Sequence, residues 1–89
     1  MISVDKACEI ATNFHNEPFV DVITDIKKGY VIGTIAKDGE SSDRPPVYVS
    51  KVDGKAESFF IPNHFEEVKN GEMLKVPERY KLQNMQRRF

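Results

Sequence analysis

The sequence has a single cysteine and lacks any long apolar segment. Cys8 has no second cysteine with which to form an intramolecular disulfide. The opening residues, MISVDKACEI, are too polar for the apolar region of a secretory signal peptide, and no apolar run approaches the roughly 20 residues of a transmembrane helix. These absences predict a cytoplasmic protein, from a bacterium or a phage.

Tryptophan and a strong net charge are also absent. Six phenylalanines, three tyrosines and 39% hydrophobic residues in 89 residues are typical of one small globular domain. The net charge of −1 excludes a whole-molecule field that would attract nucleic acid. Residues 79–89 nevertheless carry four basic and no acidic side chains, which leaves −5 on residues 1–78. We predict a single domain over residues 1–78 and a basic tail over 79–89, either helical or frayed.

The first elements expected are a helix and a β-hairpin. Ser3 is placed to cap a helix over residues 4–15, which carries one apolar stripe at helical spacing. Residues 19–26 alternate, which predicts a strand with one buried face formed by Val20, Val22, Thr24 and Ile26. A turn at Lys27 to Gly29 leads into a second strand over 30–36, where Gly33 indicates a bulge or a close backbone approach.

A second hairpin follows a long loop over residues 37–46. Its strands, 47–52 and 55–60, flank Asp53-Gly54, a dipeptide typical of tight turns. A two-residue loop would place Val47 opposite Phe60 and Tyr48 opposite Phe59. A three-residue loop with a glycine bulge would shift this register, and both alternatives remain open at this point.

The last elements expected are a short helix and a short edge strand. Asn63 and Glu66 have the spacing of a capping box, and Gly71 suits a left-handed residue just past the helix end. Met73, Leu74 and Val76 form an apolar run that Pro77 ends. The fold class predicted is α+β, with the N-terminal helix packed on an antiparallel sheet of about four strands and a short helix after the second hairpin.

This pattern resembles the small immunity proteins of bacterial polymorphic-toxin systems, which share an α-β-β-β layout with PepSY and related peptidase-inhibitory domains. The resemblance covers about residues 3–71, in the segments DKACEIATNF, GYVIGTI, PPVYVSKVDGKAESFF and IPNHFEEV. It implies a protein that acts by surface binding without catalysis. The loop over residues 38–44 is longer than this pattern has, and the segment after Pro77 has no counterpart in it.

No set of residues predicts catalysis, a metal or a cofactor. Cys8 and His15 would be roughly 10.5 Å apart along a helix axis, beyond hydrogen-bond reach. His64 and Glu67 could share a metal, but two ligands without a third do not make a site. We therefore expect no catalytic residue, no metal ligand and no cofactor, and place nucleic acid among the improbable partners because only the tail is basic.

A surface for another protein is the remaining expectation. The acidic loop residues Asp38, Glu40 and Asp43 could join Asp21, Asp25 and Asp53 to complement a basic partner. Tyr48 and Phe59 share a strand face that the primary core does not require, which makes them candidate contacts as well. The alternatives are an ordinary polar sheet face and a domain that self-associates through its tail.

Overall fold

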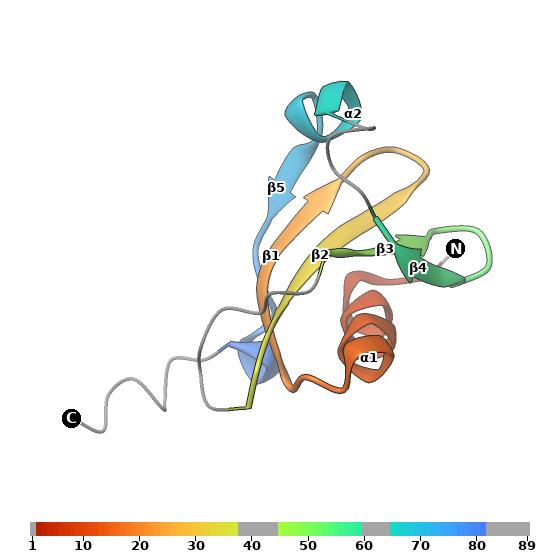
Figure 1. Cartoon of the computed structure of the whole chain (residues 1–89). Coiled ribbons are helices and arrows are strands. Elements are labelled where there is room, and N and C mark those ends of the chain that lie inside the picture. The colour runs from red at the N-terminus through yellow and green to blue at the C-terminus, as the bar shows by residue number, and fades with distance from the viewer. Residues whose placement is uncertain (1, 38–44, 60–64, 82–89) are drawn as a thin grey trace.

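A computed structural model of the chain describes residues 2–37, 45–59 and 65–81. It is an α+β fold in which one helix covers a five-stranded antiparallel sheet of strand order β4-β3-β2-β1-β5 (Figure 1). The predicted fold class is confirmed, with β5 as a fifth strand. In chain order the elements are α1 (Val4–His15), β1 (Phe19–Asp25), β2 (Gly29–Ile35), β3 (Val47–Ser50), β4 (Ala56–Ser58), α2 (Phe65–Lys69), β5 (Glu72–Leu74) and the 3-10 helix η2 (Glu78–Tyr80).

The predicted first helix is confirmed at both ends. The Ser3 side chain accepts a hydrogen bond from the Lys6 backbone N–H at 3.2 Å, which satisfies one of the free donors of the first turn. The helix ends at Asn16, which adopts the left-handed conformation with φ of 56°. Asparagine tolerates that conformation better than most residues, so the end of α1 is encoded locally.

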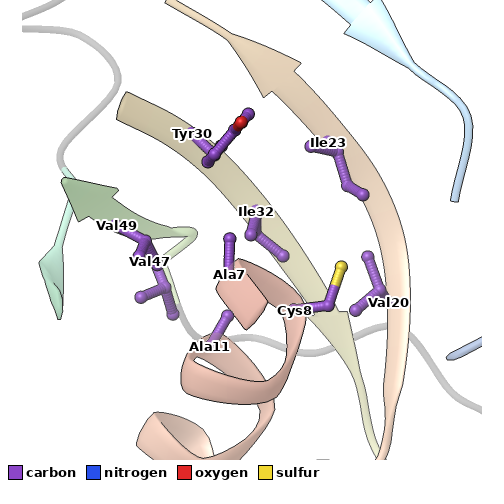
Figure 2. Packing of buried hydrophobic residues seen from close by; sticks show 9 residues of the cluster. All are labelled: Ala7, Cys8, Ala11, Val20, Ile23, Tyr30, Ile32, Val47 and Val49. Carbon is purple, nitrogen blue, oxygen red and sulfur yellow. The ribbon is translucent and has the colours of Figure 1, made fainter. Parts of the chain in front are cut away.

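The main core lies between α1 and the front face of the sheet (Figure 2). Ala7, Cys8 and Ala11 project from the helix, and their small side chains let its backbone approach the strands closely. The sheet contributes larger side chains to the same cluster, namely Val20, Ile23, Tyr30, Ile32, Val47 and Val49.

A β-bulge in β1 makes the predicted buried face of this strand wrong. Val20 pairs with Thr34 and Val22 pairs with Gly33, so Asp21 is an extra residue on β1. A bulge shifts the alternation of side chains by one position. As a result Val20 and Ile23 share the front core, whereas Ile26 belongs to a second cluster on the back face.

The second hairpin has a register that neither sequence alternative gave. Tyr48 lies opposite Glu57 and Val47 lies opposite Ser58, which corrects the pairing of Tyr48 with Phe59 and of Val47 with Phe60. The Ser50 N–H donates to the Lys55 carbonyl at 3.0 Å, so four residues close the loop. Gly54 takes the positive φ of 73° there, as the turn dipeptide predicted.

Gly71 follows α2, but its expected left-handed conformation is wrong, because φ of this residue is not positive. A Cβ at this position would lie 2.7 Å from both the Asp25 carbonyl oxygen and the Thr24 Cγ2. Glycine is needed here because the corner between α2 and β5 packs directly on the backbone of β1. The proposed cap residue Asn63 lies outside the described residues.

The ordered fold continues past the predicted boundary at residue 78. Tyr80 in η2 packs against the main core, and the Arg79 Nε lies 3.7 Å from an Asp5 carboxylate oxygen. Residues 82–89 of the predicted tail are outside the described part. Within the part of the chain that the structure describes, no helix has the length and apolar character needed to cross a membrane.

Burial makes the Cys8 thiol a weaker acid than an exposed cysteine, and this difference should make the stability of the fold depend on pH. Its pKa is raised from 9.0 to about 11, chiefly by burial and secondly by the nearby Asp5 carboxylate. Between about pH 9 and 11 the unfolded thiol releases its proton while the folded thiol keeps it, so the free energy of unfolding should fall as pH rises. We expect urea unfolding to show this loss.

A Cys8→Ala variant separates this loss from the titration of other groups. Its unfolding free energy should depend less on pH than that of the unchanged protein over the same interval. Parallel curves for the two proteins from pH 8 to 11 would contradict the assignment.

Candidate functional site

The structure brings together two of the five predicted contact residues, Tyr48 and Phe59. Phe59 is buried, however, and the two residues are not cross-strand neighbours. Tyr48 and Phe59 are stacked, with ring centroids 5.7 Å apart and ring planes at 21°. Tyr48 is half-buried, whereas Phe59 is 6% exposed and serves mainly as support for the tyrosine. Asp38, Glu40 and Asp43 lie outside the described residues, so their proposed contact role stays a prediction.

The other acidic residues of the predicted surface do not gather. Asp21 is the exposed bulge residue, while Asp53 lies in the β3–β4 turn at the other end of the sheet. Asp25 accepts a hydrogen bond from Lys51 Nζ at 2.5 Å, and Lys51 also lies over the Tyr30 ring. The Lys51 ammonium group, through this hydrogen bond, is the main cause that lowers the pKa of Asp25. These contacts indicate a structural role for Asp25.

Tyr48 is positioned by a glycine on the neighbouring strand. On β3 it lies opposite Val31, and its ring reaches toward Gly29 at the start of β2. A Cβ on Gly29 would lie 2.8 Å from Cε1 of that ring and 2.4 Å from the Val49 carbonyl oxygen. The missing side chain of Gly29 therefore provides the space in which the Tyr48 ring lies.

A small apolar cluster forms the base under this ring. Ile26, Val31 and Phe59 are buried together on the back face, and Tyr48 and Val68 pack against them. Val68 comes from α2, so this helix contacts the same cluster as Tyr48. The exposed part of the tyrosine is thus held on a rigid, apolar support.

Three carboxylates lie near enough to Tyr48 to affect its pKa. Glu57 is its direct cross-strand neighbour, and Glu67 lies on α2. Burial is the largest cause that raises the pKa of Tyr48, and the negative charges of Glu57, Glu67 and Asp53 raise it further. The phenol is therefore neutral at physiological pH and available as a hydrogen-bond donor. We name the group Tyr48, Glu57, Phe59, Glu67 and Val68 the Tyr48 surface.

The Tyr48 surface borders an open sheet edge, because β4 is the last strand on its side among the described residues. The bonds from Ser50 N–H to Lys55 and from Phe59 N–H to Pro46 fix the pairing pattern of β3 and β4. Residues 55, 57 and 59 therefore direct their backbone groups toward β3, and Ala56 and Ser58 direct theirs outward. An extended chain could pair with these outward groups.

A groove of about 640 Å³ lies between the β1–β2 turn and the α2–β5 corner. Its charged lining residues are Lys27, Lys28 and Lys51 together with Asp25, Glu67 and Glu72. Charges of both signs do not select an anion or a cation. In residues 2–37, 45–59 and 65–81 there is also no group of three or more histidine, cysteine, aspartate or glutamate side chains that could hold a metal ion.

The cysteine and histidine considered for catalysis are both buried. Cys8 has no exposed surface, and His15 is 7% exposed with its Nε2 at 2.9 Å from the Pro45 carbonyl oxygen. The histidine therefore holds the chain at the end of the long loop to the end of α1. The second proposed histidine, His64, lies outside the described residues.

We compared the chain with protein-family models, with curated proteins and with solved structures. None of the three comparisons found a match. The resemblance to immunity proteins and PepSY-like domains therefore stays a prediction from the sequence.

Three members of this surface, Glu57, Glu67 and Val68, are not among the contact residues predicted from the sequence. The correct hairpin register would have revealed Glu57, because a four-residue loop places it opposite Tyr48. No local pattern indicates Glu67, since its place beside Tyr48 depends on how α2 packs on the sheet.

Proposed function

We propose that this chain is a small, non-catalytic protein that binds another protein through the Tyr48 surface and thereby masks it, as an inhibitor or immunity protein does. The observation that carries the proposal is the half-buried Tyr48, stacked on the buried Phe59 and flanked by the carboxylate of Glu57. Rigid aromatic side chains at the centre of a polar rim are typical of binding hot spots.

The fixed packing around Tyr48 supports this proposal. The cluster under Tyr48 fixes its ring before any partner arrives, so binding would cost little side-chain entropy. The exposed carboxylates would add electrostatic attraction and orientation during encounter. A surface of this kind needs no enclosed pocket, which suits a chain of 89 residues.

Site-specific photo-cross-linking in the native host tests the proposal. We expect a photoreactive phenylalanine in place of Lys55, which is exposed two residues before Glu57 and leaves the Tyr48 surface unchanged, to form a covalent adduct with one discrete second protein. The matched control carries the same group at Asn13, which is exposed on α1. Adducts that are absent at position 55, or equal at positions 55 and 13, would contradict the proposed binding surface.

A further inference from the structure

We draw no further inference here: the strongest candidate, the pocket of about 430 Å³ at the C-terminal end of α1 that the buried Glu17 lines together with Lys37, presents charges of both signs, and nothing in the structure identifies a ligand that these charges would select.

Discussion

Replacement of Ile32 with alanine is expected to lower the free energy of unfolding by about 2–5 kcal/mol. Ile32 has no exposed surface, and in the sheet it lies between Ile23 on β1 and Val47 on β3, beneath α1. Neighbours on three sides restrict collapse around the cavity that the shorter side chain would leave. Because small domains have a total stability of only about 5–15 kcal/mol, this is a large share, and urea unfolding measures it.

The control for this experiment is Val52→Ala. Val52 is 84% exposed in the β3–β4 turn, so its truncation should change the free energy of unfolding by no more than about 0.5 kcal/mol. Similar losses for the two variants would mean that the packing between α1 and the sheet is not the main source of stability.

Gly29→Ala is expected to cost about 1–3 kcal/mol and also to disturb the Tyr48 surface. The added Cβ would lie 2.4 Å from the Val49 carbonyl oxygen, a backbone atom of the paired strand that can move only with β3 itself. It would also meet the Tyr48 ring at 2.8 Å and push the ring from its place over Gly29. Thermal unfolding gives the first effect, and the near-ultraviolet circular dichroism of the tyrosines gives the second.

Gly33→Ala is the matched control on the same strand. A Cβ there would lie 3.2 Å from the Val22 Cγ1, which belongs to a side chain that can adjust. The expected cost is below about 1 kcal/mol, and the signal from Tyr48 should not change. If Gly33→Ala proves more costly than Gly29→Ala, the close approach of Tyr48 to β2 does not limit what residue 29 can be.

Local signals made α1 predictable from the sequence. Ser3 and Asn16 mark the two ends of the helix by interactions within a few residues, and the apolar stripe between them needs no knowledge of the rest of the fold. The glycine of the β3–β4 turn was recognised for the same reason. Features that depend on distant strands were harder to predict. The bulge at Asp21 depends on the pairing with β2, and the role of Gly71 depends on the approach of β1.

The candidate site shows the same division. The sequence indicates Tyr48 and Phe59 because they lie on a strand face that the main core does not require, and in the structure their rings are stacked. Their stacking does not come from direct cross-strand pairing, because Glu57 occupies that position. Glu67 and the open edge of β4 could not be foreseen, since both follow from the strand order and from the placement of α2.

The bulge at Asp21 has a consequence for the fidelity of folding. On either side of it β1 presents opposite phases, with Val20 and Ile23 turned to α1 and Ile26 turned to the back. A pairing of β1 with β2 that is shifted by one residue could therefore place the side chains of one half of β1 on the correct face of the sheet. It would turn the side chains of the other half to the wrong face. Because no shifted pairing places the side chains of both halves on their correct faces, the extra residue restricts β1 to a single alignment in the sheet.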